Sequence, residues 1–479
     1  MKEKSSNNYQ ILLNLLIVVY ILYIVLSVFK ERTLLTDDLA SAYGLKTISG
    51  SYLSFVHTYL DSQTMGARPV SVFITATVCF LARNNESVYF LGLLFFPLSL
   101  MVIYWVARKI FSKELASLIT LLYSVSLIGT SIQFSTMMLN SNLATIFFAL
   151  SIYFVYIRKN IVLSSVCFIA SVLSYEIFLP LVLLNLFLIK ENKKRLLFAI
   201  LTLGAVFLFR KVIQPAIFVH YYQRDEVSKV LEVKRVLFVI VLAFKMFFYD
   251  FFVAIYKGVL HLRKMDVLGL IMSVIIPLTV YKIFYNYDFR SKSEAFKKLS
   301  ILSLVAMLLG LSIFLFSSYV PTLFGFENRN LGAIRLFYTL FIISGVIWLS
   351  IKLKLKQKTI SIFLSMITFF LVITNISVKD SWIYAAKFNN ALFSKLKTAL
   401  KENNIESGEI CLEYGVFDEL KSNPNFTLRE PIFYKRWESA QLCKMNGIDP
   451  LKIHVDNIID KKECNATFLY KNGKMVLAK

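Results

Sequence analysis

The sequence predicts an all-α polytopic membrane protein of about 11 transmembrane helices with a small α+β domain at its C-terminal end. Of the 479 residues, 57% are hydrophobic and only 17% are charged, too little charge to cover a soluble chain of this length. Apolar runs of about 15 to 20 residues recur along the chain, and such runs span a ~30 Å hydrocarbon layer. Basic residues gather in the short loops between the runs.

The expected spans follow the apolar runs in order. Eleven runs are expected to cross the membrane, at residues 11–29, 87–106, 115–132, 142–157, 161–175, 177–190, 196–210, 267–285, 299–319, 331–350 and 359–378. The stretch 69–82 is short for a crossing, so it is expected to be re-entrant or interfacial. The stretch 236–256 contains Lys245 and Asp250 and is expected to be an amphipathic helix on the membrane surface.

The distribution of charge agrees with this topology. Residues 380–479 carry 15 Lys and Arg against 13 Asp and Glu, so residues 1–379 carry +21 of the total net charge of +23. With the N-terminus in the cytoplasm, the basic short loops all lie on the cytoplasmic side, as the positive-inside rule predicts. These loops contain Arg108/Lys109/Lys113, Arg158/Lys159, Lys190/Lys193/Lys194/Arg195, Arg290/Lys292/Lys297/Lys298 and Lys352/Lys354/Lys356/Lys358. Nucleic acid is not expected as a partner, because no basic patch is interleaved with stacking aromatic residues.

An odd number of crossings places the end of the chain outside the cytoplasm. The expected domains are a multi-span transmembrane domain at 1–378 and a soluble extracytoplasmic domain at 379–479. Helical spacing over 383–400 and strand-like runs at Glu409–Tyr414 and Thr467–Tyr470 predict an α+β fold for the second domain.

Two features of the C-terminal domain stay open. Its cysteines, Cys411, Cys443 and Cys464, allow one internal disulfide and one free thiol in an oxidising compartment, but the spacing does not fix the pairing. The side of the membrane depends on the stretch 236–256, because a full crossing there would move the last two basic loops outside the cytoplasm.

An acidic pair, Asp37-Asp38, lies in the first outside loop, shortly after the first span. Two adjacent carboxylates can bind a cation, or one can act as a general base while the other tunes its pKa. The same residues can also begin a short helix, with Thr36 or Asp37 as its N-cap. The two interpretations are compatible, because the start of a surface helix displays a carboxylate well.

Three arginines are candidates for contacting an anionic group near the same face. Arg68 opens the short apolar stretch, Arg329 lies in an outside loop, and Arg335 lies one or two turns into the next span. The planar guanidinium group donates two hydrogen bonds to a phosphate. Arg68 and Arg329 also fit interfacial snorkelling to lipid headgroups. Arg335 needs a partner inside a span, and Glu327 or Glu176 is expected to supply it.

Polar residues between short apolar runs give further candidates for binding a substrate. Tyr175 and Glu176 lie between two short runs, where a kink lined by a hydroxyl and a carboxylate can hold a polar substrate. They can equally form the polar turn of a helical hairpin. His220 lies beside tyrosines in a loop, and such a residue is usually interfacial.

This layout resembles the membrane-embedded glycosyltransferases of the GT-C fold. The resemblance rests on one span followed by an outside loop with the acidic pair Asp37-Asp38, then an interfacial segment that opens with Arg68-Pro69. The basic, aromatic turn Ala107-Arg108-Lys109-Ile110-Phe111-Ser112-Lys113 also resembles the turn that follows the second span of that group. Size and tail look most like the bacterial and phage-encoded serotype-converting glucosyltransferases that decorate O-antigen.

The resemblance implies transfer of a hexose such as glucose from a polyprenyl-phosphate-linked donor. The acceptor would be a cell-surface polysaccharide or a lipid-linked glycan at the outer face of a bacterial inner membrane. If the site roles of that group are transferred to this sequence, Asp37 or Asp38 would be the catalytic carboxylate, and Arg68, Arg329 or Arg335 would hold the donor phosphate. No cofactor is implied with certainty, and a divalent cation at the acidic pair is left open. The sequence departs from the group because Leu39-Ala40, and not an aromatic residue, follows the pair.

Other functions remain as alternatives. Walker A, GxGxxG, GxSxG and HExxH motifs are absent, so nucleotide hydrolysis, Rossmann cofactors and zinc proteolysis are not supported. A flippase for lipid-linked sugars predicts charged residues in mid-span and related halves; the sequence has few of the former and no related halves. A polysaccharide polymerase or ligase and a non-enzymatic scaffold are the other two alternatives.

Overall fold

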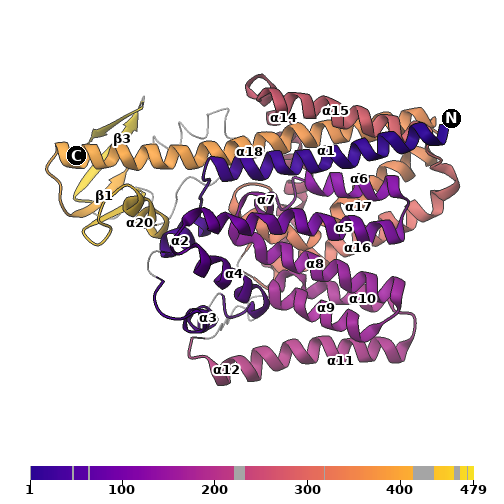
Figure 1. Ribbon diagram of the computed structural model, residues 1–479, viewed down its shortest axis with the longest axis horizontal. Helices are drawn as coiled ribbons and strands as arrows, with labels where there is room; N and C mark the ends of the chain where they lie inside the picture. Colours follow the sequence, from indigo (N-terminus) through magenta and orange to yellow (C-terminus); the bar gives the residue numbers. More distant parts are fainter. Residues whose placement is uncertain are drawn as a thin grey trace.

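Long helices run side by side, up and down one axis, and form a bundle (Figure 1). The structure is a computed structural model that describes residues 2–45, 48–62, 65–220, 232–317, 319–413, 436–457, 464–471 and 473–478. The N-terminus lies at one end of the bundle, and the C-terminal strands lie beyond the other end.

The bundle is built from α-helices, with short 3₁₀ or π segments marked η. Its first half contains α1 Lys2–Lys30, α2 Asp37–Gly44, α3 Tyr52–Leu60, α4 Pro69–Ala82, η2 Glu86–Leu94, α5 Phe95–Ile110, α6 Lys113–Ser124, α7 Ser131–Phe134, η3 Thr136–Met138, α8 Leu139–Tyr153, η4 Phe154–Arg158, α9 Ile161–Ser174, η5 Glu176–Leu181 and α10 Val182–Leu188. Its second half contains α11 Asn192–Leu208, η6 Phe209–Ile213, α12 Gln214–Ile217, α13 Val233–Lys245, η8 Met246–Asp250, α14 Phe251–His261, η9 Leu262–Lys264, α15 Val267–Phe284, η10 Arg290–Lys292, α16 Ser293–Leu311, η11 Ser312–Leu315, η12 Phe326–Leu331, α17 Gly332–Lys352 and α18 Gln357–Glu402.

Many of these helices are long and apolar enough to cross a membrane. In the described part of the chain, nine segments meet this condition: Asn8–Lys30, Glu86–Ile110, Thr136–Arg158, Asn192–Ile217, Val233–Lys264, Val267–Phe284, Arg290–Leu315, Phe326–Lys352 and Gln357–Glu402. Pro69–Ala82, Ile161–Ser174 and Glu176–Leu188 form shorter apolar helices. The prediction of an all-α polytopic membrane protein is confirmed at this level, while the number of crossings stays a prediction.

Helix α11 shows why the chain needs an apolar solvent. Leu196, Ile200, Leu203 and Phe207 are all exposed, and their spacing places them on one face of the helix. Phe198 on the inner face is buried. A soluble monomer rarely exposes a continuous apolar stripe of this kind, whereas a lipid-facing helix requires one.

One end of the bundle, here named the basic end, contains the N-terminal part of α1 and the turns with the five basic clusters. The Gln10 amide donates to the Lys113 carbonyl oxygen at 3.2 Å, and Arg290 donates to the Leu355 carbonyl oxygen at 3.3 Å. The turns that begin at Arg158 and at Lys190 closely follow Tyr156 and Leu188. These two residues line one cavity together with the start of α16, which places both turns at the same end of the bundle. The expectation that these clusters share one side is therefore consistent with the structure. The opposite end is named the far end.

The segment Val233–Lys264 is continuous and long enough to cross, but both of its ends lie at the far end. Near its start, Arg235 donates to the carbonyl oxygens of Phe314 and Ser317 at 3.0 and 2.6 Å. Near its end, His261 Nε2 lies 2.8 Å from Asp380 Oδ2. Phe314 and Asp380 each lie roughly 35 Å from the start of a helical segment that begins at the basic end. This geometry supports the expected surface helix over 236–256.

The expected span 115–132 does not form one helix. Helix α6 ends at Ser124, residues 125–130 are not helical, and α7 is a single turn. The prediction was wrong here because periodicity does not reveal what stabilises a break. Gly129 adopts a φ of +72°, which residues with a side chain rarely do. Arg335 donates to the freed carbonyl oxygens of Tyr123, Ser124 and Gly129.

The C-terminal domain continues directly from the bundle. Helix α18 runs unbroken from Gln357 to Glu402, so the expected boundary between 378 and 379 lies inside a helix and the predicted helix over 383–400 is part of it. Beyond α18 come β1 Gly408–Leu412, α20 Arg436–Met445, β2 Ile453–Asn457, β3 Ala466–Lys471 and β4 Lys474–Leu477.

The strands form a four-stranded sheet in the order β2-β1-β3-β4, with β1 parallel to β2 and β3. The two predicted strands correspond to β1 and β3, and Tyr414 lies outside the described residues. Cys411 of β1 forms a disulfide with Cys464, while Cys443 is free and buried. The small α+β domain expected from the sequence is thus present.

The placement of Val233–Lys264 predicts that both of its ends react from the same side of the membrane. Single cysteines at Val233→Cys and Arg263→Cys, both exposed positions, should react with a membrane-impermeant maleimide in the same orientation of sealed vesicles. Lys354→Cys at the basic end should react only in the opposite orientation. Labelling of Val233→Cys and Arg263→Cys from opposite sides would show that the segment crosses.

Candidate functional site

The acidic pair begins α2 at the far end, as the sequence predicts. Thr36, one of the two residues expected there, occupies the N-cap position, but it has a φ of 52° and its side chain makes no capping hydrogen bond. Positive φ is rare for a β-branched residue and stores strain. The two carboxylates differ in environment, because the Asp37 side chain is 38% exposed whereas Asp38 is 1% exposed.

Asp38 is held inside the protein by neighbours from two other segments. Its Oδ1 accepts hydrogen bonds from the Tyr89 hydroxyl at 2.8 Å and from the Met137 backbone N–H at 2.9 Å. Burial raises the pKa of Asp38 to about 7, although Ser135, Met137 and Tyr89 stabilise its charged form. Asp38 therefore binds α2 to the segments that contain η2 and η3.

Arg68 pairs with Glu176 at the same end. The guanidinium donates two hydrogen bonds of 2.8 Å, one to each carboxylate oxygen, and lies 4.4 Å from the centre of the Tyr175 ring. Pro69 follows Arg68 at the first position of α4, where the missing N–H costs nothing. The Ser71 hydroxyl donates to the Ser174 carbonyl oxygen at 3.0 Å and so fixes α4 against the turn that carries Glu176.

Arg329 pairs with Asp37 and completes a polar cluster. Its guanidinium donates to the Asp37 carboxylate and lies 3.7 Å from Glu327. The Asn330 amide donates to Glu327 at 3.0 Å and accepts from the Tyr175 hydroxyl at 2.9 Å. Asp37, Arg329, Glu327, Asn330, Tyr175, Arg68 and Glu176 thus form one connected set, here named the far-end cluster.

The far-end cluster can bind an anion by exchange of partners. Both arginines are neutralised by carboxylates, and both pairs are partly exposed. A phosphate oxygen offers the same bidentate hydrogen bonds as a carboxylate. Binding of a phosphate at Arg329 would free the Asp37 carboxylate to accept a proton.

Arg335 does not reach this cluster. Its side chain is fully buried, and its guanidinium donates to the Tyr123 carbonyl oxygen at 2.7 Å. Glu327 and Glu176, the expected partners, pair with the other two arginines instead. The expected pairing was wrong because backbone carbonyls freed by a helix break are invisible to sequence spacing. We therefore do not retain a phosphate-binding role for Arg335.

His220 also lies apart from the far-end cluster. Its backbone N–H donates to the Asp61 carboxylate at 2.7 Å, and its ring Nδ1 lies 3.2 Å from the same carboxylate. These hydrogen bonds hold the pKa of Asp61 below its ordinary value. His220 thereby ties the end of α12 to the loop that leads to Arg68, which makes it a positioning residue at most.

A shared cation between Asp37 and Asp38 does not fit this arrangement. The Asp37 carboxylate faces Arg329, and the Asp38 carboxylate faces Tyr89 and the Met137 N–H, so the two do not converge on one point. In the part of the chain that the structure describes, no group of three or more His, Cys, Asp or Glu side chains could hold a metal ion.

Sequence reasoning missed the residues that support the acidic pair. Tyr89 and Met137 lie 51 and 99 positions from Asp38, and no local pattern connects them to it. Arg210, which acts electrostatically on Glu176, was also missed, although a cation at the end of an expected span is a usable signal. Lys444 of α20 lies 5.2 Å from the centre of the Tyr43 ring, so the C-terminal domain contacts α2.

Comparison with protein-family models, with curated proteins and with solved structures finds no match for this chain. The fold by itself defines a class, a polytopic helical membrane protein with a small C-terminal sheet. Its chemistry has to be argued from the far-end cluster.

Replacing Arg335 should affect stability before activity. Arg335→Met would remove the guanidinium hydrogen bonds to the carbonyl oxygens of Tyr123, Ser124 and Gly129. Ser124 would keep the Gln133 amide donor at 2.7 Å and Gly129 the Ile132 N–H at 3.1 Å, so the loss is that of the charged donor, about 1.5–3 kcal/mol for each hydrogen bond. The purified variant should unfold at a clearly lower temperature in detergent than Arg329→Met, which loses a partly exposed pair. A variant as stable as the wild type would contradict this structural role.

The environment of Asp38 predicts a pH dependence of stability. Its pKa is raised from 3.8 to about 7 in the folded protein, so the folded state binds more protons than the unfolded state between these values. The wild type should lose thermal stability relative to Asp38→Asn as pH rises from about 4 to about 7, and the difference should then level off. Parallel curves over this range would show that Asp38 is not the buried acid described here.

Proposed function

We propose that this chain is a membrane glycosyltransferase that moves a sugar, such as a hexose, from a polyprenyl-phosphate-linked donor to a surface polysaccharide or a lipid-linked acceptor. The proposal rests on the far-end cluster, in which Arg329 pairs with Asp37 of the acidic pair and Arg68 pairs with Glu176. A lipid-linked donor accounts for a polar site at one end of a membrane bundle. It also explains why the chain needs no nucleotide-binding motif.

In the proposed reaction, the two arginines bind the donor phosphate. Arg329 and Arg68 turn from Asp37 and Glu176 to the phosphate oxygens, which accept the same bidentate hydrogen bonds from a guanidinium as a carboxylate does. As the bond between the sugar C1 and the phosphate oxygen breaks, negative charge grows on the leaving polyprenyl phosphate. Two fixed cations lower the free energy of that transition state.

Asp37 is the proposed general base. It is the more exposed carboxylate of the pair, and it loses its cation when Arg329 binds phosphate. The acceptor hydroxyl then gives its proton to Asp37 while its oxygen forms the new bond to C1. Asp38 is too buried to touch an acceptor and is proposed to position α2 through Tyr89 and Met137.

The orientation in the membrane is part of the proposal. The basic end would face the cytoplasm of a bacterial inner membrane, because basic loops remain on that side. The far-end cluster and the C-terminal domain would then lie on the outer face. The disulfide between Cys411 and Cys464 supports this orientation, since such bonds persist in oxidising compartments.

The test is mass spectrometry of surface polysaccharide from cells that carry no copy, the wild type or single variants. The wild type should add a hexose-sized mass. Asp37→Asn and Arg329→Gln should abolish the gain at equal protein level, because each removes a group that acts on reacting atoms. Asp38→Asn keeps an oxygen that accepts from Tyr89 and Met137, so it should retain partial activity. Asp288→Asn, which changes an exposed carboxylate at the basic end, is the matched control.

Three outcomes would redirect the assignment. A mass gain that survives both Asp37→Asn and Asp38→Asn would remove the carboxylate mechanism. An unchanged monosaccharide content with a changed chain length would favour the polymerase or ligase alternative. Accumulation of lipid-linked donor on the cytoplasmic side without the protein would favour the flippase.

A further inference from the structure

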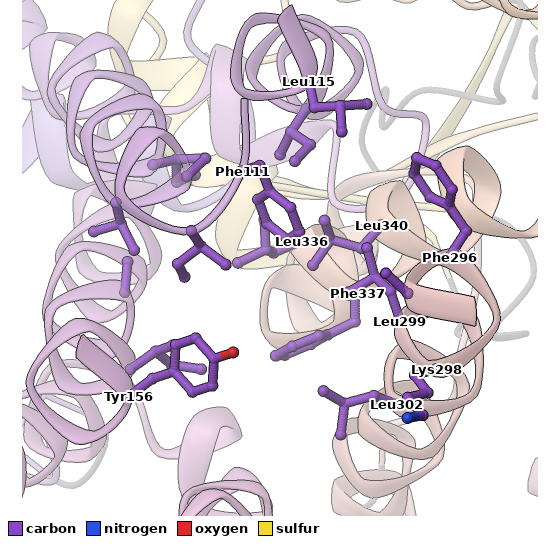
Figure 2. Close-up of a pocket in the computed structure, with 18 of the residues that line it drawn as sticks. Phe111, Leu115, Tyr156, Phe296, Lys298, Leu299, Leu302, Leu336, Phe337 and Leu340 are labelled. Carbon is purple, nitrogen blue, oxygen red and sulfur yellow. The ribbon is translucent and has the colours of Figure 1, made fainter. Parts of the chain in front are cut away.

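An apolar cavity lies at the basic end, away from the far-end cluster. It has a volume of about 530 Å³ and is enclosed by α5, α6, α8 and α10 on one side and by α16 and α17 on the other. Figure 2 shows Phe111 and Leu115 on one wall and Leu299 and Leu302 on the facing wall. Almost all of the lining side chains are aliphatic or aromatic.

The polar groups of the cavity gather at its opening. Lys292 and Lys298 both line it and are exposed, and the Tyr156 hydroxyl points into it (Figure 2). Lys292 also hydrogen-bonds to the Tyr287 hydroxyl at 3.0 Å. One acidic side chain, Glu294, lies 3.9 Å from Lys298. The opening thus has two cations and a hydroxyl donor against one carboxylate.

The cavity extends from the basic end into the middle of the bundle, because on α17 its lining reaches Leu336, which lies roughly 24 Å along the helix from Lys352. Its lining follows α16 from Ala295 to Leu302 and α5 from Ile110 to Ile103, and each stretch rises roughly 10 Å. From Lys292 to Leu302 the lining rises roughly 15 Å, which equals the ~15 Å of hydrocarbon in a single leaflet. A single hydrocarbon chain entering beside the lysines would therefore end inside the protein.

We propose that this cavity binds an anionic phospholipid of the leaflet at the basic end. One acyl chain lies between α5 and α16, and the headgroup phosphate lies between Lys292, Lys298 and Tyr156. The occupant follows from charge complementarity together with depth. A zwitterionic lipid would fill the apolar walls and bring the same phosphate, but it would also bring a quaternary ammonium group, which Lys292 and Lys298 repel.

This site is separate from the proposed glycosyl transfer. The rings of Phe178 and Phe337 both contact the ring of Phe148, with centroid distances of 5.6 and 5.8 Å, respectively. Phe337 lines the cavity, and Phe178 belongs to η5, the segment that begins with Glu176. This aromatic layer closes the cavity below the far-end cluster. Lipid binding can therefore be measured without any assay of transfer.

The test is native mass spectrometry of the full chain in detergent, titrated with phosphatidylglycerol or with phosphatidylcholine of the same acyl chains. The wild type should retain phosphatidylglycerol more strongly. Lys298→Gln and Lys292→Gln should each weaken its binding by about fivefold, since one lysine near an anionic lipid contributes on that order, and should weaken binding of the zwitterionic phosphatidylcholine less. Glu294→Gln should strengthen binding of phosphatidylglycerol.

Matched controls separate this site from general lipid adhesion. Leu299→Trp fills the cavity and should weaken binding of both lipids, whereas Leu304→Trp, exposed on the same helix outside the cavity, should not. Lys297→Gln removes an exposed charge next to Lys298 that does not line the cavity and should have no effect. Equal losses for Lys297→Gln and Lys298→Gln, or wild-type retention in Leu299→Trp, would overturn the proposal.

Discussion

The buried guanidinium of Arg335 is the interaction on which the far end of the bundle depends. Residues 125–130 leave the helical path within a closely packed region, and such a break is tolerated at membrane depth only where protein groups satisfy the freed carbonyls. Arg335 satisfies those of Tyr123, Ser124 and Gly129. Its charge needs no acid for this purpose, because several aligned carbonyl dipoles stabilise a cation. A cation inside a span is therefore structural here.

The non-helical segment 125–130 and the residues that follow it also position Arg329 and Asp38. The Asn328 amide donates to the Leu127 carbonyl oxygen at 3.3 Å and to the Leu323 carbonyl oxygen at 2.8 Å, which fixes the turn that presents Arg329. A few residues later, the Met137 N–H holds Asp38. The acidic pair and its arginine are thus anchored to one irregular segment, although about 290 residues of sequence separate them.

The sequence allowed prediction of what depends on composition and local spacing. Apolar runs, basic turns, the surface helix near 236–256 and the strands at Glu409 and Thr467 all follow from such local rules. Asp37, Arg68, Tyr175, Glu176 and Arg329 were selected as charged or polar residues at span ends, and the structure brings them together. The break after Ser124 and the support of Asp38 by Tyr89 could not be predicted. Both depend on contacts between distant segments that leave no periodic signal.

The pairing within the far-end cluster also limits how tightly it can hold a lipid phosphate. Partly exposed ion pairs contribute about 0–1 kcal/mol each, so exchanging a carboxylate for a phosphate at Arg68 or Arg329 is nearly balanced. In the proposed reaction, free arginines would bind the polyprenyl phosphate product more strongly than the donor, because the monoester carries more negative charge than the diester, and would slow its release. Glu176, Glu327 and Asp37 compete for the same guanidinium groups and restore the resting pairs once the product leaves. In the proposed reaction, such competition would reduce binding of the donor while keeping both cations in place for the transition state, where the phosphate carries more negative charge than in the donor.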